Sequence, residues 1–265
     1  MPVKKALKRL INGLGYDVRR RQDTDSDMRT TMAESYALMH RLGFRPKVIV
    51  DVGVGRGTSD LHSAFPEAYL LLIEPLAAFE PVMVSALQGR QGSYVLAAAG
   101  ASAGTVSIHV HDDLEGSSLY EETMGAEADG FVAAVPQVTI DDVLAEKRLH
   151  GPFLIKADVQ GAELDVLRGA QGALAATEAV VLEVSLFGFQ KGAPQFYDVV
   201  QFMKERDFVA YDIIEARNRP LDSALGQVDI VFVRESGRFR QDHSWARLGH
   251  VRQGGARAAA LHPPL

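Results

Sequence analysis

Short apolar runs that alternate with helical patterns are the feature that most limits how this chain can fold. Aliphatic and β-branched residues fill runs at 47–51, 69–74, 93–98, 153–157, 179–184, 208–214 and 228–233. Strands that are apolar throughout and separated by helices are typical of a mostly parallel sheet covered on both faces. The last two runs are joined by a segment too poor in helical pattern for a crossover, so we predict an antiparallel last strand. We therefore expect an α/β fold with a seven-stranded, mostly parallel sheet and helices on both faces.

Other patterns indicate the domain organisation. Residues 24–42 carry apolar residues at helical spacing, and residues 106–110 alternate between apolar and polar, which predicts a two-sided strand. Residues 112–137 hold several glycines and prolines and are predicted to be rich in loops. We divide the chain into a helical extension at 1–45, one α/β domain at 46–236, and a tail at 237–265 that we expect to be mobile.

Composition and charge exclude several classes of protein. The chain has 265 residues and no cysteine, which rules out disulfides, thiolate metal sites and cysteine nucleophiles. Its net charge is −6, although residues 1–21 hold seven basic residues and one acidic residue. The rest of the chain is therefore strongly acidic, and we expect no nucleic-acid partner, because phosphate binding needs a basic face.

The basic start of the chain has two interpretations. Apolar residues recur at helical spacing among its cations, so residues 1–21 are predicted to form an amphipathic helix. In a cytoplasmic protein this helix would contact anionic lipid at the inner membrane face. Alternatively it packs on the domain, or on a partner subunit of a homo-oligomer. We favour packing, and both interpretations stay open.

A glycine loop follows the first predicted strand of the sheet. Gly53, Gly55 and Gly57 come directly after the apolar run that ends at Asp51 and Val52. Glycines let a backbone approach a ligand closely, and ligands of open α/β sheets bind at the carboxyl ends of the strands. Without further signals, such a loop is a plain strand-to-helix turn about as often as it is a cofactor site.

An acidic residue strengthens the cofactor interpretation. Glu74, followed by Pro75, ends the next predicted strand, where a carboxylate can accept hydrogen bonds from two ribose hydroxyls. Nicotinamide and S-adenosylmethionine enzymes both use this arrangement. The dinucleotide pattern is G-x-G-x-x-G, but here the sixth position is Thr58, which favours S-adenosylmethionine. Asp51 would then suit the ammonium group of the methionine portion.

A second cluster of polar residues follows a later strand. Lys156, Asp158 and Gln160 alternate along the chain, so they are expected to share one face at the carboxyl edge of the sheet. Burying three polar groups there costs free energy unless they are paired or used. The structural alternative is a Lys156–Asp158 pair with Gln160 capping the turn.

These motifs resemble the FkbM-type S-adenosylmethionine-dependent methyltransferases over roughly residues 47–235. The resemblance rests most on the segment from Leu154 to Glu163. It is supported by the residues at 50–53, 57, 74–75, 138–142, 166–170, 182–185 and 228–233. Gln160 stands where the family often has Glu. The resemblance implies a Rossmann-like Class I methyltransferase fold and O-methylation of a sugar, a glycan or a glycosylated natural product.

Catalytic roles fall on three residues. Asp158 is the first candidate for a general base or an acceptor anchor, since a positioned base activates a weakly nucleophilic hydroxyl. Lys156 would orient Asp158 or reduce the charge cost of a forming alkoxide. Glu183, at the end of the next strand, is a second carboxylate, with a helix cap or a salt bridge as its structural alternative. Two neighbouring carboxylates could also hold a divalent ion.

Further residues are weaker candidates. Ser117 could bind the adenine or the acceptor, and Asp141 is a candidate cofactor ligand or a helix cap. Gln160, Glu163 and Phe187 are candidates for acceptor binding, and Phe187 would either stack on a sugar ring or close the core. His109 and His111 share a strand face, but an exposed strand edge explains them better than a metal site, so we assign no metal ligand.

Two other functions compete with methyl transfer. A nicotinamide-dependent oxidoreductase is disfavoured by the glycine spacing and by the lack of a Tyr-x-x-x-Lys pair near the sheet edge. A non-catalytic binding module with the cofactor fold would be expected to carry damage in the glycine loop or at Asp158, and neither is damaged.

Overall fold

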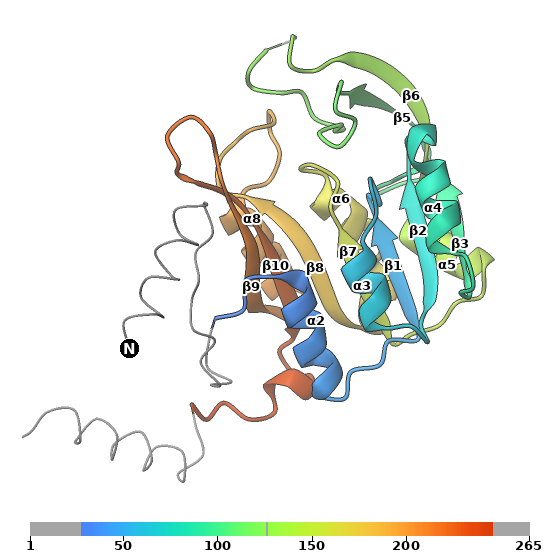
Figure 1. Cartoon of the computed structure of the whole chain (residues 1–265), viewed down its shortest axis with the longest axis vertical. Helices are drawn as coiled ribbons and strands as arrows, with labels where there is room; N and C mark the ends of the chain where they lie inside the picture. Colours follow the sequence, from blue (N-terminus) through green and yellow to red (C-terminus); the bar gives the residue numbers. More distant parts are fainter. Residues whose placement is uncertain (1–27, 126, 246–265) are drawn as a thin grey trace, which may run out of the picture.

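The computed structural model describes residues 28–125 and 127–245 (Figure 1). The predicted basic helix at 1–21 and the end of the predicted tail lie outside these residues. A seven-stranded sheet, a three-stranded sheet and the helices around them form the described part of the chain. None of its helices has the length and apolar character needed to cross a membrane.

The main sheet confirms the predicted fold. Its strands are β1 (Val48–Val52), β2 (Tyr69–Glu74), β3 (Gly92–Leu96), β7 (Phe153–Ala157), β8 (Thr177–Ser185), β9 (Phe208–Asn218) and β10 (Leu225–Arg234). They follow the order β3-β2-β1-β7-β8-β10-β9. The last strand, β10, is antiparallel to both of its neighbours and lies between β8 and β9 rather than at the edge. Every residue of β1 and β7 is buried, as expected for central parallel strands.

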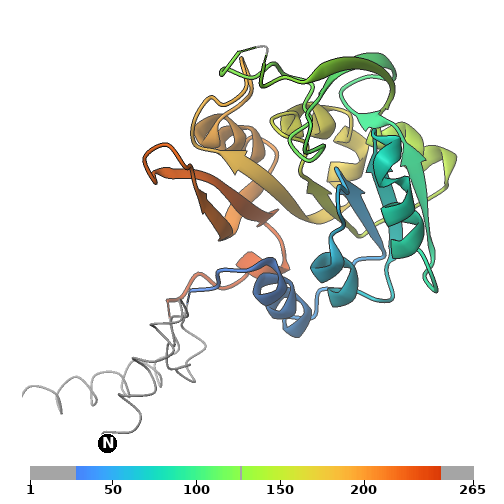
Figure 2. The same ribbon diagram turned by 45° about the horizontal axis from the view of Figure 1, so that its top comes forward.

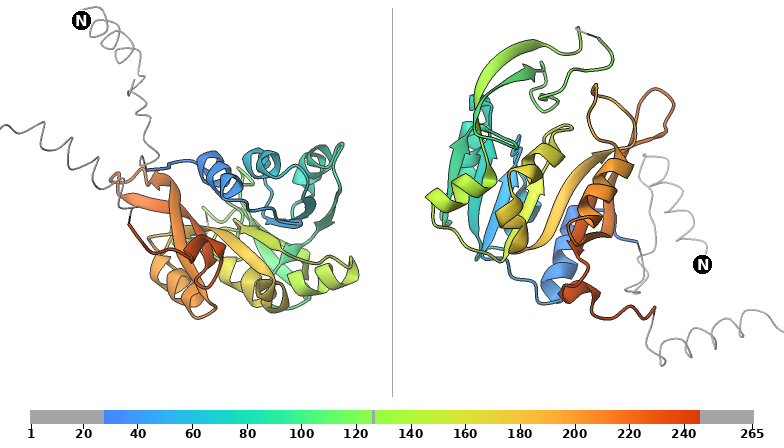
Figure 3. Two further views of the ribbon diagram at one scale, coloured as in Figure 1. Left: turned by 90° about the horizontal axis from the view of Figure 1, so that it is seen from below. Right: turned by 180° about the vertical axis from the view of Figure 1, so that it is seen from behind.

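Helices cover both faces of this sheet (Figure 3). One face carries α2 (Met32–Arg41), α3 (Ser59–Ala64), the 3₁₀ turn η1 (Ala77–Phe79) and α4 (Glu80–Ala86). The other carries α5 (Ile140–Glu146), α6 (Glu163–Arg168), α7 (Gln171–Ala175) and α8 (Phe196–Lys204). Apolar side chains of alternate strand residues form a separate core cluster against each helical layer, because successive strand residues point to opposite faces.

The described part of the N-terminal extension belongs to the core of the domain. Thr31 and Glu34 form a capping box that starts α2 at Met32, within the longer helix predicted over 24–42. Tyr36 and Phe44 are fully buried in the same cluster as β1 and β2. On the C-terminal side, the 3₁₀ turn η2 (Arg238–Arg240) also contacts this core.

A small second sheet lies above the carboxyl ends of β1 and β2 (Figure 2). It contains β4 (Ala98–Ala99), β5 (Gly104–Val110) and β6 (Phe131–Val138), in the order β4-β6-β5. The two-sided strand predicted at 106–110 is confirmed as part of β5. Strand β6 corrects the prediction of loop at 112–137: Pro136 disfavours a strand, and only one residue of β6 is buried, so the sequence lacks a strand's alternation.

Candidate active site

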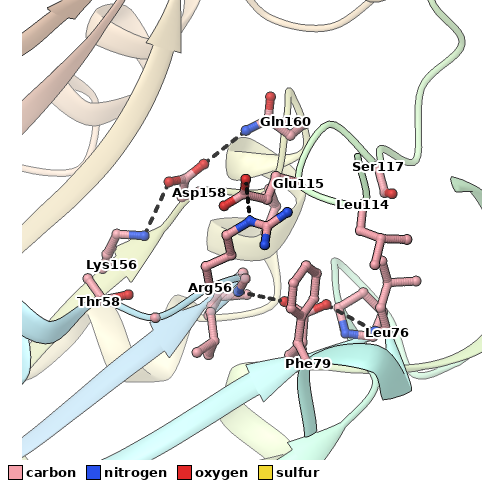
Figure 4. Close-up of a pocket in the computed structure, with 18 of the residues that line it drawn as sticks. Arg56, Thr58, Leu76, Phe79, Leu114, Glu115, Ser117, Lys156, Asp158 and Gln160 are labelled. Carbon is pink, nitrogen blue, oxygen red and sulfur yellow. Dashed lines mark hydrogen bonds and ion pairs between the residues drawn. The ribbon is translucent and has the colours of Figure 1, made fainter. Parts of the chain in front are cut away.

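A cavity of about 500 Å³ opens at the carboxyl ends of the main-sheet strands (Figure 4). One end is formed by the glycine loop, the end of β2 and the small sheet. The other end reaches the loop after β7 and the adjoining parts of β9 and β10. The wall includes nine of the predicted site residues: Gly53, Gly55, Gly57, Glu74, Pro75, Ser117, Lys156, Asp158 and Gln160.

Close backbone packing joins the glycine loop to the loop after β7. Gly53 has φ +74°, in the left-handed region that favours glycine. A Cβ atom at Gly53 would lie 1.9 Å from the carbonyl oxygen of Asp158. The Asp158 N–H donates to the carbonyl of Val52 at 3.1 Å. The two sequence motifs therefore form one continuous wall of the cavity.

Glu74 is fixed by the backbone on both sides of it. One carboxylate oxygen accepts from the N–H of Gly55 at 3.1 Å, and the other accepts from the N–H of Leu76 at 3.0 Å. Burial raises the pKa of Glu74, while these backbone hydrogen bonds act in the opposite direction. Each oxygen keeps a further lone pair, so the carboxylate can still accept from ligand hydroxyls.

We expect Glu74→Ala to weaken binding of S-adenosylhomocysteine at least about 30-fold, because charge-assisted hydrogen bonds to a buried carboxylate contribute about 1.5–3 kcal/mol each. Isothermal titration calorimetry measures the change, with exposed Glu146 changed to Ala as the control. Glu74→Gln should lose less, because its amide oxygen can still accept. Equal affinity of Glu74→Ala and the parent protein would exclude a ligand role.

An apolar compartment adjoins Glu74 and was not predicted from the sequence. Leu76 and Phe79 follow β2, Ile108 comes from β5, and Leu114 and Leu119 come from the loop beyond it. Such residues match ordinary core residues in the sequence, and only the small sheet brings them together over the cavity. Their surfaces suit a flat aromatic ring rather than a charged group.

Ser117 lies on the rim of this compartment, as Figure 4 shows. Its hydroxyl oxygen accepts from the N–H of His111 at 3.1 Å. The neighbouring Ser118 is buried, and its hydroxyl donates to the carbonyl of Gln160 at 2.6 Å. The serine pair therefore connects the small sheet to the loop after β7.

Buried Lys156 and half-buried Asp158 form a pair at the far end of the cavity. Lys156 Nζ lies 3.3 Å from Asp158 Oδ2 and 3.9 Å from Asp51 Oδ1. Burial by itself favours a neutral lysine, but the charges of Asp158 and Asp51 outweigh it and raise the pKa of Lys156. Lys156 is therefore a fixed cation and cannot serve as a base near neutral pH.

Gln160 connects two carboxylates. Its side-chain amide donates to Asp158 Oδ1 at 3.0 Å and to Glu183 Oε2 at 2.9 Å. Its φ of +53° is uncommon for a residue other than glycine, and this turn directs its side chain back towards Asp158. The structural alternative for the cluster, a paired Lys156 and Asp158, is thus present, and the same residues also line the cavity.

Glu183 lies behind the cavity wall instead of on it. Besides Gln160, it accepts from Arg217 Nη1 at 3.0 Å and from Gln227 Nε2 at 3.2 Å. Burial and the nearby charge of Asp158 raise the pKa of Glu183 to about 8, and Arg217 opposes this rise. Glu183 thus lies near Asp158, as predicted, with Gln160 bonded to both. The contacts of Glu183 favour a positioning role over direct catalysis.

Two other predicted cofactor ligands do not reach the cavity. Asp51 is fully buried beside α3, where Oδ2 lies 2.8 Å from His62 Nε2. Asp141 accepts from the N–H groups of Gly172 and Ala173, both at 2.8 Å, and so caps α7. For Asp141 the structure favours the helix-cap alternative. Asp51 instead places its other oxygen, Oδ1, 3.9 Å from Lys156 Nζ.

The predicted acceptor ligands Glu163 and Phe187 also lie away from the cavity wall. Glu163 is buried and accepts from the N–H groups of Val159 at 3.0 Å and Gly161 at 3.2 Å, which closes the turn that holds Gln160. Phe187 packs beneath the guanidinium of Arg219 at 3.9 Å. Both contacts are local and stabilise the loops around the site.

Strands β9 and β10 add wall residues that the sequence did not indicate. Glu215 and Arg217 come from β9, and Asp229 comes from β10. Asp229 was part of an apolar motif of the last strand, and nothing in the sequence distinguished its position from that of a neighbouring core residue. The insertion of β10 between β8 and β9 brings it to the cavity.

No cluster of three or more metal-ligating side chains occurs in the part of the chain that the structure describes. His109 of β5 lies 3.9 Å from Asp129, and His111 follows the end of β5.

Three buried carboxyl groups are expected to make stability fall as pH rises. Burial raises the pKa of Glu163 to about 7, of Glu183 to about 8 and of Asp229 to about 7. The folded state therefore binds these protons more tightly than the unfolded chain. Their stabilisation is complete below the ordinary pKa of about 4 and is lost as pH rises through 7 to 8.

Differential scanning fluorimetry should show this trend as a fall in Tm of roughly 5 °C between about pH 5 and about pH 8.5. The Asp229→Asn variant should show a smaller fall, because one of the three groups no longer titrates. A Tm that increases over this range would contradict the assignment.

Comparisons with known proteins agree with this geometry. The model of the methyltransferase FkbM domain matches residues 51–210. A methyltransferase FkbM from Methylobacillus flagellatus KT is 17% identical with a TM-score of 0.45, and the match covers 69% of this chain and 43% of that chain. The chain therefore spans less than half the length of that protein. No functionally curated protein is significantly similar.

Two further solved structures are similar to this chain at low identity. Magnesium protoporphyrin IX methyltransferase from Synechocystis PCC 6803, with bound S-adenosylmethionine, is 13% identical over 87% of this chain and 96% of its own, with a TM-score of 0.40. A 1,6-didemethyltoxoflavin-N1-methyltransferase from Burkholderia thailandensis is 13% identical over 76% of this chain and 77% of its own, with a TM-score of 0.39.

The position of antiparallel β10 inside an otherwise parallel sheet, together with the glycine loop after β1, defines a Class I methyltransferase. The domain match extends over more than half of the chain, so the protein belongs to the FkbM methyltransferase family. S-adenosylmethionine is accordingly its cofactor, and the oxidoreductase alternative is set aside.

Proposed function

We propose that this protein transfers the methyl group of S-adenosylmethionine to a hydroxyl of a sugar, a glycan or a glycosylated natural product. The observation that carries the proposal is the polar end of the cavity, where Asp158 is held by Lys156 and Gln160. A hydroxyl acceptor needs hydrogen-bond acceptors of this kind, and an apolar wall would not supply them.

Two neighbouring regions of the cavity fit the ribose and the adenine of the cofactor. The carboxylate of Glu74 suits the ribose hydroxyls, and the compartment around Leu76 and Phe79 suits the adenine. The glycine loop leaves room for close approach, because side chains there would fill the space. When bound, S-adenosylmethionine supplies an electrophilic methyl group on a sulfonium.

The residues of the chain would then position the acceptor. Methyl transfer is an in-line displacement, and correct alignment can contribute up to roughly 7–11 kcal/mol in well-oriented reactions. We assign Asp158 to anchor an acceptor hydroxyl, with Lys156 and Gln160 fixing the direction of its carboxylate. Glu183 and Arg217 hold Gln160 in place from behind.

Transfer of tritium from methyl-labelled S-adenosylmethionine to a panel of methyl glycosides tests the acceptor class. Each glycoside is paired with its deoxy analogue, which lacks one hydroxyl. We expect incorporation into at least one glycoside and none into the analogue that lacks the modified hydroxyl. Labelling that is independent of every hydroxyl, or no labelling of any glycoside, would contradict the proposed acceptor.

The basic start of the chain supports a separate proposal about location. Packing on the domain or on a partner subunit is the favoured interpretation of residues 1–21. As its alternative we propose that they bring a cytoplasmic enzyme to anionic lipid, since cations and apolar residues alternate there at helical spacing. Sedimentation with phosphatidylglycerol vesicles should retain the full chain and lose a variant without residues 1–21. If neither protein sediments, packing on the domain or on a partner subunit is the better interpretation. Light scattering separates these two, because only loss of a subunit contact would lower the molar mass of the variant to that of a monomer.

A further inference from the structure

A buried carboxylate at the acceptor end of the cavity has no role in the function described so far. Asp229 is only 4% exposed, and it lines the cavity. Within residues 28–125 and 127–245, no hydrogen bond or ion pair engages its carboxylate. Buried carboxylates are normally paired, so an unpaired one that faces a ligand cavity needs an explanation.

Strand register places Asp229 in a row of polar side chains on one face of the sheet. Asp51 of β1 pairs with Lys156 of β7, and Lys156 pairs with Val181 of β8. Glu183 lies two residues beyond Val181, on the same face, and it pairs with Asp229 of β10. The row thus runs from beneath the glycine loop to the acceptor end, and Asp229 is its last member.

The partners of the other carboxylates leave little room for base chemistry. Asp158 accepts from Lys156 with one oxygen and from Gln160 with the other, so both of its oxygens are already held by neighbouring side chains. Glu183 accepts from Gln160, Arg217 and Gln227 and does not line the cavity. Of these three carboxylates, only Asp229 lines the cavity without a hydrogen bond or ion pair to another described side chain.

Several titratable or charged groups face Asp229. They are Lys156 from β7, Asp158 from the loop after it, Glu183 from β8, Glu215 and Arg217 from β9, and the neutral Tyr36 hydroxyl from α2. Burial, and after it the charge of Asp158, raise the pKa of Asp229 to about 7, although Lys156 and Arg217 act in the opposite direction. A base is most effective when its pKa lies near the working pH.

We propose that Asp229 is the general base that takes the proton from the acceptor hydroxyl, while Asp158 anchors the acceptor. This inference rests on the proposed O-methyl transfer. The O–H bond breaks and its proton passes to an Asp229 oxygen, while an oxygen lone pair of the acceptor forms the new C–O bond. The C–S electron pair stays on sulfur, and Asp229 later releases its proton to water.

Kinetics of the isosteric Asp229→Asn variant test the role. We expect turnover of a glycoside that the parent enzyme methylates to fall about 10²–10⁴-fold, with affinity for S-adenosylhomocysteine unchanged within a few fold. The parent enzyme should lose activity below about pH 7, where Asp229 is protonated. The residual activity of the variant should not show this loss. Exposed Asp142→Asn serves as the control for loss of one charge. More than a tenth of parental turnover, or an unchanged pH profile, would overturn the proposal.

A second measurement needs no acceptor and detects failure to fold. In protein labelled with ¹³C at aspartate carboxyls, one resonance should titrate near pH 7 with S-adenosylhomocysteine bound, and it should be missing from Asp229→Asn. A value near the ordinary 3.9 for Asp229 would refute the base assignment. If no glycoside is methylated, the proposed acceptor class fails, whereas this titration still decides whether Asp229 has the basicity required.

Discussion

Asp158→Asn is expected to lower turnover about 10³-fold while affinity for S-adenosylmethionine changes only a few fold. The carboxylate accepts from Lys156 on one oxygen and from Gln160 on the other. Asparagine has one acceptor oxygen, so its amide NH₂ must face one of these two donors. The anchor for the acceptor would lose its charge and its direction together.

Initial rates and calorimetry on the same preparations measure the two quantities separately. Asp142→Asn again removes one exposed carboxylate and should behave as the parent protein. A loss of cofactor affinity as large as the loss of turnover would place Asp158 in cofactor binding instead. Parental turnover in Asp158→Asn would remove it from the acceptor site altogether.

The second large effect is expected from Gly53→Ala. The new Cβ would lie 1.9 Å from the carbonyl oxygen of Asp158 and 2.8 Å from its carbonyl carbon. The backbone cannot move as a flexible side chain does, so the glycine loop or the loop after β7 has to shift. The left-handed φ of +74° adds a strain of about 1–2 kcal/mol. We expect Tm to fall by roughly 10 °C and S-adenosylhomocysteine binding to weaken at least about 100-fold.

Gly89→Ala is a matched control for this prediction. Gly89 has φ +71°, yet no atom lies within 4 Å of the position of its Cβ. This variant should show the strain alone, with a Tm loss of a few degrees and unchanged ligand binding. Equal effects of the two substitutions would show that the contact between the glycine loop and Asp158 does not matter.

The main sheet was predictable because its signals are local. Central strands such as β1 and β7 are buried throughout, and that burial demands the continuous apolar runs seen in the sequence. Strand β6 gave no such signal. Phe131 and Val132 at its start are exposed, and Pro136 interrupts it, so its residues resemble a loop.

The position of the glycine loop and of Glu74 on the cavity wall was predictable for a similar reason. Gly53 follows β1 directly and Glu74 ends β2, where the chain must turn at the sheet edge. Asp141 shows the limit of this approach. A carboxylate in a family motif is equally suited to bind a ligand or to cap a helix, and only its distances to Gly172 and Ala173 separate the two.

The acceptor end depends on strand order, which no single segment encodes. Asp229 and Glu183 are 46 positions apart in the printed sequence and become direct partners only because β10 enters the sheet beside β8. The same insertion brings Arg217 to Glu183. Residues that gain their role from such pairings look like ordinary strand residues until the topology is known.

The most direct test of sugar O-methylation is to identify the atom that receives the methyl group. The protein is incubated with S-adenosylmethionine labelled with ¹³C in the methyl group and with the glycosides, and the product is examined by NMR. We expect a methyl ether on one sugar hydroxyl, formed by the parent protein and nearly absent with Asp158→Asn. A methyl group on nitrogen or carbon, or an ether formed equally by the Asp158→Asn variant, would contradict it.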